Sequence, residues 1–471
     1  MKTKNQETLR LLREFESRNV TFMEADGSWP MVWECAKGVY VWDANGRRYL
    51  DLTAAFGVAA AGHANARVVK AGQQQMARLL HAMGDVHPHA LKARLARELS
   101  RITFERWTSH DLKTQTSSIR PRIAKLKAQR SKLRLQISNF KSQISNLKPA
   151  AKGKTIFCNS GFEAVEAALK TALLATGKPG VIAFDKGYHG LGYGALNATH
   201  RPLFRAPFLS QLGNFGCFVP FPTKPEELEK VECAISRLLR KQEIGAILVE
   251  PIQGRGGINV PPPAFLPMLR RLSSDSGALL IVDEVYTGLG RTGRWFACEH
   301  SETIPDLICL GKALTGGFPL SACVGRADLM DAAWPSSCGE AIHTSTFLGH
   351  PVGCAMALAQ IAEIRDRRLV QRSSKLGKFF FMKLLGLQIP RAETRGLGLM
   401  IGVELRSQDG SPATKSAWRV VKEMLRRGYI LLPEGENGNV LGFTPPLTID
   451  QRQLQQASDE LKEVLRQESM L

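Results

Sequence analysis

Short apolar runs alternate with amphipathic stretches along the C-terminal two-thirds of the chain. The apolar runs occupy residues 155–158, 181–184, 246–249, 278–283 and 307–310. Each run has the length of a buried strand, and the stretch after the first one has the spacing of an amphipathic helix that Gly177 ends. This alternation predicts an α/β fold in which helices cover a mainly parallel sheet.

Polar or ionisable residues follow the ends of these predicted strands. They are Asn159 and Ser160 before Gly161, then Glu250, the pair Asp283 and Glu284, and Lys312. Ligands of an open parallel sheet bind at the carboxyl ends of its strands, so we expect these groups to lie together. A single carboxylate at a strand end is often structural. An acid and a lysine on successive strand ends, beside a helix N-terminus, indicate a catalytic site.

The chemistry of these residue types indicates a cofactor. A lysine amine can form a Schiff base with an aldehyde, and a carboxylate can keep a pyridine nitrogen protonated. A helix that begins with a glycine binds phosphate through free backbone N–H groups. Aldehyde, pyridine and phosphate together describe pyridoxal 5′-phosphate.

Longer motifs identify a family. In chain order they read SGFEAVEAALK, FDKGYHG, EPIQGRGG, DEVYTGLGRTG, LGKALTGGFPLSA, HTSTFLGHP and RGLGLMIGVE. Together they closely resemble the class III (subgroup II) aminotransferases, which are pyridoxal-phosphate enzymes of fold type I. The resemblance implies a large cofactor-binding domain at residues 61–345. It also implies a small α+β domain built from both chain ends, residues 1–60 and 346–471.

The resemblance also implies roles for residues at the cofactor. Lys312 would form the Schiff base and shuttle a proton, and Asp283 would pair with the pyridine nitrogen. Tyr188 would stack on the cofactor ring beside His189, and Tyr286 would lie near the phenolic oxygen, where the family often has Gln.

The phosphate site of the family draws on two subunits. Ser160, Gly161 and Phe162 would bind the phosphate, mainly through backbone groups, and Thr346 would reach in from a second subunit. Phe162 stands where a small or hydroxyl residue is usual, so a side-chain hydroxyl is missing there. The resemblance therefore implies a homodimer with shared active sites.

Substrate recognition follows the same resemblance. Arg395 would bind the α-carboxylate of glutamate or its 2-oxo acid, and Glu250 would neutralise Arg395 when an amine without that group is bound. Leu191 stands where acetylornithine and 4-aminobutyrate aminotransferases carry an arginine for a distal carboxylate. Residues 193–208 are instead similar to diamine aminotransferases. We expect transfer from an amine or ω-amino donor to a 2-oxo acid such as 2-oxoglutarate or pyruvate.

Almost half of the net charge of +20 comes from one segment of the 471-residue chain. Residues 111–150 hold ten Lys or Arg and one acid, and residues 136–149 repeat a seven-residue pattern, QISNFKS then QISNLKP. The segment, bounded at 109–152, is interpreted as an inserted amphipathic or coiled-coil helix. A solvated insertion is favoured over a nucleic-acid-binding arm, because Phe140 is its only aromatic residue.

The rest of the sequence bears on other classes of protein. No apolar run reaches the ~20 residues that cross a bilayer, and the charged start lacks a secretory apolar region, so a cytoplasmic protein is expected. The nine cysteines form no C-x-x-C pair, so neither a metal site nor disulfides are expected. An aminomutase or racemase of the same fold stays open. A basic scaffold with a vestigial core is a second alternative, against which the intact Lys312 and Asp283 argue.

Overall fold

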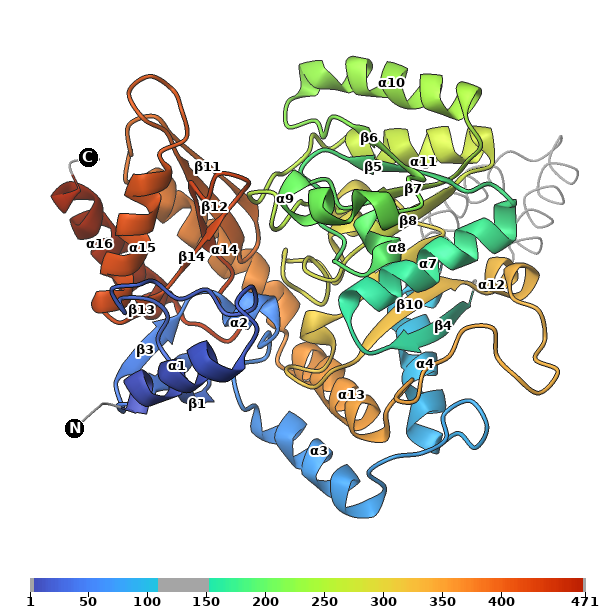
Figure 1. Cartoon of the computed structure of the whole chain (residues 1–471), viewed down its shortest axis with the longest axis horizontal. Coiled ribbons are helices and arrows are strands. Elements are labelled where there is room, and N and C mark those ends of the chain that lie inside the picture. Colours follow the sequence, from blue (N-terminus) through green and yellow to red (C-terminus); the bar gives the residue numbers. More distant parts are fainter. Residues whose placement is uncertain (1–3, 109–151, 469–471) are drawn as a thin grey trace, which may run out of the picture.

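A seven-stranded sheet forms the centre of the larger part of the molecule (Figure 1). The computed structural model describes residues 4–108 and 152–468, so most of the predicted insertion lies outside the described residues. In spatial order the strands are β4 (Gly153–Cys158), β10 (Ser321–Arg326), β9 (Leu307–Leu310), β8 (Leu279–Asp283), β7 (Ile244–Val249), β5 (Gly180–Phe184) and β6 (Gly216–Val219). Strands from β9 to β6 are parallel, whereas β10 runs antiparallel to β4 and β9. The mainly parallel sheet is confirmed, with β6 and β10 as additional strands.

Both faces of this sheet are covered. Leu248 of β7 and Ile281 of β8 pack with the apolar side of α7 (Gly161–Thr176) on one face. Val249 and Val282 point the other way, into the core that contains α11 (Phe265–Ser276). Strands buried on two faces need apolar residues at every position, which explains the continuous apolar runs in the sequence.

The smaller part is built from both ends of the chain and lies on the left in Figure 1. One sheet contains β1 (Trp33–Lys37), β2 (Tyr40–Asp43), β3 (Arg48–Asp51) and β13 (Tyr429–Ile430). A second contains β11 (Ala392–Leu397), β12 (Met400–Leu405), β15 (Val440–Phe443) and β14 (Leu432–Glu434). β13 pairs in parallel with β3, which joins the two chain ends. The predicted small α+β part is confirmed, whereas its boundaries stay a prediction.

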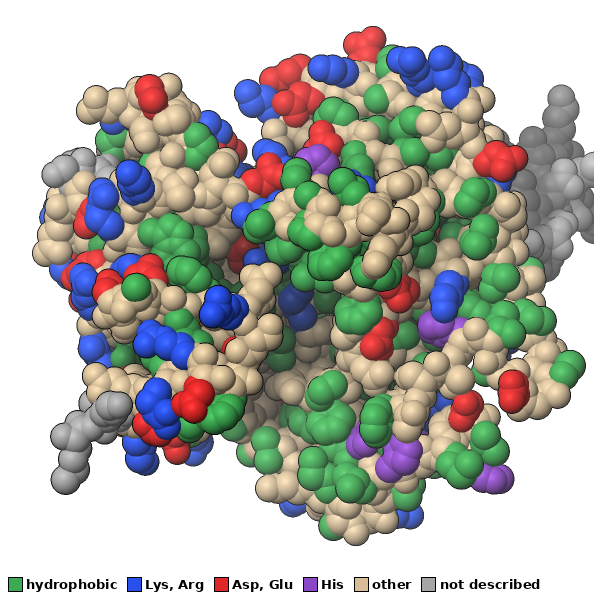
Figure 2. All heavy atoms as spheres, viewed as in Figure 1, with side chains coloured by type: hydrophobic (Ala, Val, Ile, Leu, Met, Phe, Trp, Pro, Cys, Tyr) green, Lys and Arg blue, Asp and Glu red, His purple; other side chains and the backbone are tan. Residues whose placement is uncertain are grey.

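The remaining helices surround these sheets. The smaller part also contains α14 (Leu369–Leu385), α15 (Thr414–Arg426) and α16 (Gln451–Gln467). The others are α1 (Lys4–Phe15), α2 (Ala54–Gly57), α3 (Ala66–Arg78), α4 (Ala90–Ile102), α8 (Tyr193–Leu196), α9 (Pro202–Arg205), α10 (Leu228–Lys241), α12 (Ala327–Ala333) and α13 (Pro351–Asp366). Within the described ranges, no helix combines the length and apolar character that spanning a membrane requires. Figure 2 shows the surface hollowed where the two parts meet.

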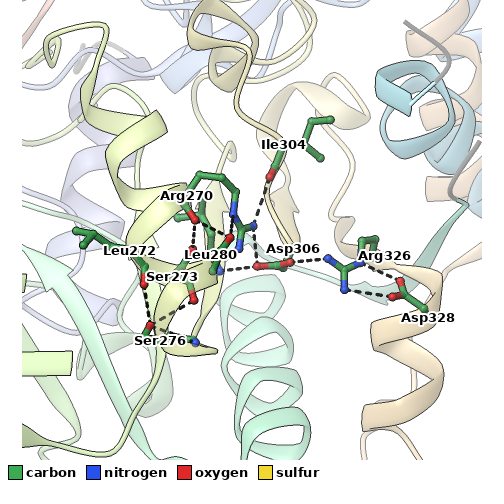
Figure 3. Close-up of polar contacts among 11 residues, drawn as sticks. Arg270, Leu272, Ser273, Ser276, Leu280, Ile304, Asp306, Arg326 and Asp328 are labelled. Atoms are coloured by element: carbon green, nitrogen blue, oxygen red, sulfur yellow. Dashed lines mark hydrogen bonds and ion pairs between the residues drawn. The ribbon is translucent and has the colours of Figure 1, made fainter. Parts of the chain in front are cut away.

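A polar network joins the ends of the strands on the side of the large sheet where β8 and β9 begin (Figure 3). Asp306 accepts hydrogen bonds from Arg270 at 2.8 Å, from Arg326 at 3.0 Å and from the backbone N–H of Leu280 at 2.9 Å. These partners come from α11, β10 and β8. The network therefore fixes one end of the strands whose other ends carry Asp283 and precede Lys312.

Candidate active site

A cavity of about 380 Å³ lies at the carboxyl ends of the central strands. It is lined by Gly161, Phe162, Tyr188, His189, Gly190, Leu191, Glu250, Arg255, Asp283, Val285, Tyr286 and Lys312. The sheet therefore brings together the α7 N-terminus, Glu250, Asp283 and Lys312, as the strand-end argument predicts. Of the predicted site residues, Ser160, Thr346 and Arg395 do not line this cavity.

Asp283, the last residue of β8, is held by two donors. His189 Nδ1 lies 2.8 Å from Oδ2, and the backbone N–H of Val285 donates to Oδ1 at 3.1 Å. Both side chains of the His189–Asp283 pair are buried. A buried carboxylate with fixed donors has a defined orientation and keeps its negative charge in the cavity at a lower energetic cost.

Lys312 lies two residues beyond β9 and faces the same cavity. Its Nζ is 4.5 Å from the centre of the Tyr286 ring. Burial lowers the pKa of Lys312, while the charges of Asp283 and Glu250 act to raise it. Its φ is +37°, a conformation that costs a non-glycine residue of order 1–3 kcal/mol and is found mainly at functional sites.

The N-terminus of α7 forms the anion-binding end of the cavity. Glu163 accepts the N–H of Asn159 at 2.7 Å and of Ser160 at 3.4 Å and so caps the start of the helix. Within the described residues, the buried Ser160 Oγ has no hydrogen-bond partner. A Cβ on Gly161 would lie 2.8 Å from Val285 Cγ1, so a larger residue there would require Val285 to move.

Tyr188 and His189 are positioned by a tight turn. Gly190 has φ +113°, and a Cβ there would lie 2.2 Å from Cβ of Phe162. The backbone N–H of Tyr188 donates to Glu250 at 2.9 Å. Phe162 therefore packs against the turn that carries both cavity-facing side chains, so a bulky residue at this position has a structural use.

Arg395 and Glu250 have separate partners. Arg395, on β11, donates to Glu404 at 2.7 Å and to the carbonyls of Gly257 at 2.7 Å and Ile258 at 3.1 Å. Glu250 accepts the N–H of Gly254 at 3.0 Å as well as that of Tyr188. Burial raises the pKa of Glu250. Within the described residues, Arg395 and Glu250 form no ion pair with each other.

The last two predicted residues differ in location. Tyr286 lines the cavity, and its hydroxyl lies 3.2 Å from the hydroxyl of Thr444. Burial raises the pKa of Tyr286, so the phenol stays protonated. Thr346 is exposed and does not line the cavity, although the neighbouring Ser345 accepts a hydrogen bond from Asn159 at 3.4 Å.

Comparison with known proteins decides the family. Residues 22–118 and 126–465 match the family model Aminotransferase class-III. The chain belongs to this family. The match is interrupted only at residues 119–125 within this span, so it includes much of the segment interpreted as an insertion.

The relatives of this class III aminotransferase are named after different substrates. An acetylornithine aminotransferase of Methanosarcina mazei is 34% identical over 442 residues, covering 94% of this chain and 93% of the relative. A putrescine aminotransferase of Pectobacterium atrosepticum is 32% identical over 478 residues, covering 98% and 89%. Among solved structures, the ornithine aminotransferase from Toxoplasma gondii ME49 superposes with a TM-score of 0.79 and 27% identity, covering 99% and 96%.

The class III aminotransferase is a pyridoxal-phosphate-dependent transaminase, and its cavity fits that cofactor. The unpartnered Ser160 hydroxyl and the α7 N-terminus suit a phosphate. The buried Asp283 suits a protonated ring nitrogen, and the Lys312 amine suits an aldehyde. Gly161 lets the start of α7 pack closely against Val285 in the cavity wall.

Two charged residues near the cavity were missed by the sequence reasoning. Arg255 lines the cavity wall, and Glu434, at the end of β14, is buried and interacts electrostatically with Lys312. Arg255 lies inside the EPIQGRGG motif, where only Glu250 was considered. Glu434 ends a strand of three residues that has no apolar run, so no strand-end signal marks it.

Proposed function

We propose that this enzyme transfers an amino group from a diamine or ω-amino donor to a 2-oxo acid. The observation that carries the proposal is one cavity that contains both the buried His189–Asp283 pair and the Lys312 amine. The missing arginine at Leu191, which lines the same cavity, favours donors other than acetylornithine or 4-aminobutyrate. Similarity to a putrescine aminotransferase over 98% of the chain supports this choice.

Each cofactor-facing residue has a proposed task. When bound, pyridoxal phosphate supplies an aldehyde for the amine and a ring that accepts electrons from the substrate carbon. Lys312 presents an amine whose pKa is lowered by burial, so it can both bind the aldehyde and carry a proton to or from that carbon. Asp283, oriented by His189, holds the proton on the ring nitrogen. Tyr286 donates toward the phenolic oxygen.

The remaining groups orient and enclose the cofactor and the substrate. The backbone N–H groups of Gly161 and Phe162, with the Ser160 hydroxyl, bind the phosphate. Tyr188 covers the cofactor ring. Arg395 binds the α-carboxylate of the 2-oxo acid, and Glu250 balances its charge when an amine is bound.

We propose a homodimer in which Thr346 of one subunit completes the phosphate site of the other. Exposed apolar side chains on α3 and nearby segments support this assembly: Met76, Leu79, Leu80, Met83, Val86, Ile342 and Phe347. Figure 2 shows hydrophobic side chains and histidines gathered over α3 on the lower part of the face. An exposed apolar surface of this kind marks protein–protein contact. A cytoplasmic location is also proposed, in keeping with the free cysteines of the described residues.

A donor and acceptor panel tests the function. Purified enzyme with pyridoxal phosphate is supplied with diamines, ω-amino acids or monoamines, each with 2-oxoglutarate or pyruvate, and the amino acid product is quantified. Turnover with diamines or ω-amino donors is expected, and the Lys312→Ala variant serves as the blank. The absence of product from every pair, or turnover restricted to acetylornithine, would overturn the proposal.

A further inference from the structure

Two segments that are distant in the sequence meet beside the cavity. The backbone N–H of Gly435 donates to the carbonyl of Arg255 at 3.1 Å. Gly257 and Gly435 have φ values of +114° and +85°, and a Cβ on Gly257 would lie 3.4 Å from the Gly435 Cα. This close backbone approach holds Arg255, from the large part of the molecule, next to Glu434, from the small part.

Arg255 has a positioned guanidinium with free donors. Its central carbon lies 5.2 Å from the centre of the Tyr188 ring and 6.0 Å from that of Phe204. The residue lines the cavity, and no side-chain hydrogen bond or ion pair joins it to any other described residue. An arginine held by aromatic rings, with its N–H groups unused, is well suited to bind a carboxylate.

Glu434 is the complementary group. Only 7% of the residue is exposed, and among the described residues its carboxylate has no hydrogen-bond or ion-pair partner. It interacts electrostatically with Arg255, Lys312 and Glu250, and burial raises its pKa to about 7. A buried carboxylate without a close partner is costly, and a cationic ligand group would remove that cost.

We propose that Arg255 and Glu434 form a two-charge subsite for the substrate end remote from the reacting carbon. Arg255 binds the distal carboxylate of a five-carbon 2-oxo diacid, and Glu434 binds the distal ammonium of a diamine donor. The inference rests on the transaminase function proposed above and adds its substrate class. It explains how a cavity with Leu191 in its wall can still select a diacid as acceptor.

A subsite with both charges suits an enzyme that binds two different substrates in turn. A transaminase binds an amine and a 2-oxo acid in turn at the same place, so the remote end of the cavity meets a cation and then an anion. The charge of Arg255 acts to lower the pKa of Glu434, yet the two side chains are not joined in an ion pair. Each is therefore available to a ligand of opposite sign, while the other partly balances its charge when no ligand is bound.

Arg255 is tested with matched acceptors. Arg255→Leu should lower kcat/KM for 2-oxoglutarate about tenfold or more, through KM, and leave pyruvate nearly unchanged. Glutarate, which cannot react, should bind the wild-type holoenzyme and lose about tenfold in affinity in the same variant, measured by calorimetry. Arg255→Lys should restore part of the glutarate affinity. Arg205→Leu, which removes an arginine over the Phe218 ring outside the cavity lining, is the control.

Glu434 is tested with matched donors. Glu434→Gln should lower kcat/KM for 1,4-diaminobutane about tenfold and leave butylamine within about twofold, because only the diamine has a second ammonium. Glu434→Asp, which keeps the charge, should retain part of the preference. Equal losses for both amines, or unchanged glutarate binding in Arg255→Leu, would overturn the subsite. Failure of the transaminase proposal would show instead as no product with any donor, while the glutarate measurement still reports on Arg255.

Discussion

His189 Nδ1 lies 2.8 Å from Oδ2 of Asp283, and both side chains are buried beneath the cavity. The backbone N–H of Val285 donates to the other carboxylate oxygen at 3.1 Å. The His189–Asp283 pair therefore has a fixed orientation before any ligand arrives. A charge that is held in place in a region of low dielectric does not have to reorganise during the reaction, which makes its effect large.

Replacing Asp283 with Asn should lower kcat by about 100-fold or more without unfolding the protein. The amide keeps the shape of the carboxylate but cannot stabilise a protonated ring nitrogen. Steady-state kinetics gives the rate, and thermal unfolding with far-UV circular dichroism checks the fold. His189→Gln should have a smaller effect, because it loosens the carboxylate without removing its charge. Turnover near the wild-type value in Asp283→Asn would show that another group fills this role.

Replacing Lys312 with Ala should abolish turnover while pyridoxal phosphate still binds. The α7 N-terminus proposed to bind the phosphate does not include Lys312, so non-covalent affinity should persist. Equilibrium dialysis measures the bound cofactor, and borohydride treatment should fix it covalently in the wild type only. Lys154→Ala, at an exposed lysine, is the control. Turnover above background in Lys312→Ala would contradict the assignment.

The sheet and most of the cavity could be predicted because they depend on local sequence. Runs such as residues 246–249 and 278–283 are apolar throughout, since both faces of β7 and β8 are covered. Residues that directly follow such strands, among them Glu250 and Asp283, then meet at one edge of the sheet. The family motifs located Tyr188, His189 and Lys312 in the same cavity.

Contacts between distant segments could not be predicted in the same way. Glu434 lies next to the cavity residue Arg255 because Gly435 is hydrogen-bonded to Arg255, a tertiary contact that leaves no periodic signal in the sequence. The hydrogen bonds of Arg395 to Glu404 and to two backbone carbonyls are also tertiary contacts, and no sequence pattern indicates them. The interface around Thr346 stays a prediction.

Dimer formation should be required for full cofactor affinity. Thr346 is exposed, and we propose that its hydroxyl reaches the phosphate of a second subunit. We expect a dimer in sedimentation velocity, and Thr346→Val should weaken pyridoxal phosphate binding severalfold, whereas Thr346→Ser should not. Phe347→Asp, which places a charge among exposed apolar residues, should shift the enzyme toward monomers. A monomer with full activity at the assay concentration would refute shared sites.

The buried carboxyl of Glu284 should make the stability of the enzyme depend on pH. Burial raises its pKa from 4.5 to about 7, although Thr287 and the N–H groups of Ala297 and Cys298 donate to it and oppose the shift. Because the folded state binds this proton more tightly than the unfolded state, the stabilisation is complete below pH 4.5. This stabilisation is lost as the pH rises toward the folded-state pKa of about 7. At higher pH the contribution of Glu284 to the free energy of unfolding no longer changes.

Glu284→Gln removes this titration and tests it. The free energy of unfolding of the wild type, relative to Glu284→Gln, should fall by a few kcal/mol at most between pH 4.5 and 7. Urea unfolding at intervals across this range measures the difference, and a constant offset from the altered hydrogen bonds does not affect the slope. Glu423→Gln is the control, since its hydrogen bond from Arg427 lowers the pKa of Glu423 and moves its titration below this range. A difference that is flat or rises with pH would mean that Glu284 is ionised throughout, stabilised by its three donors.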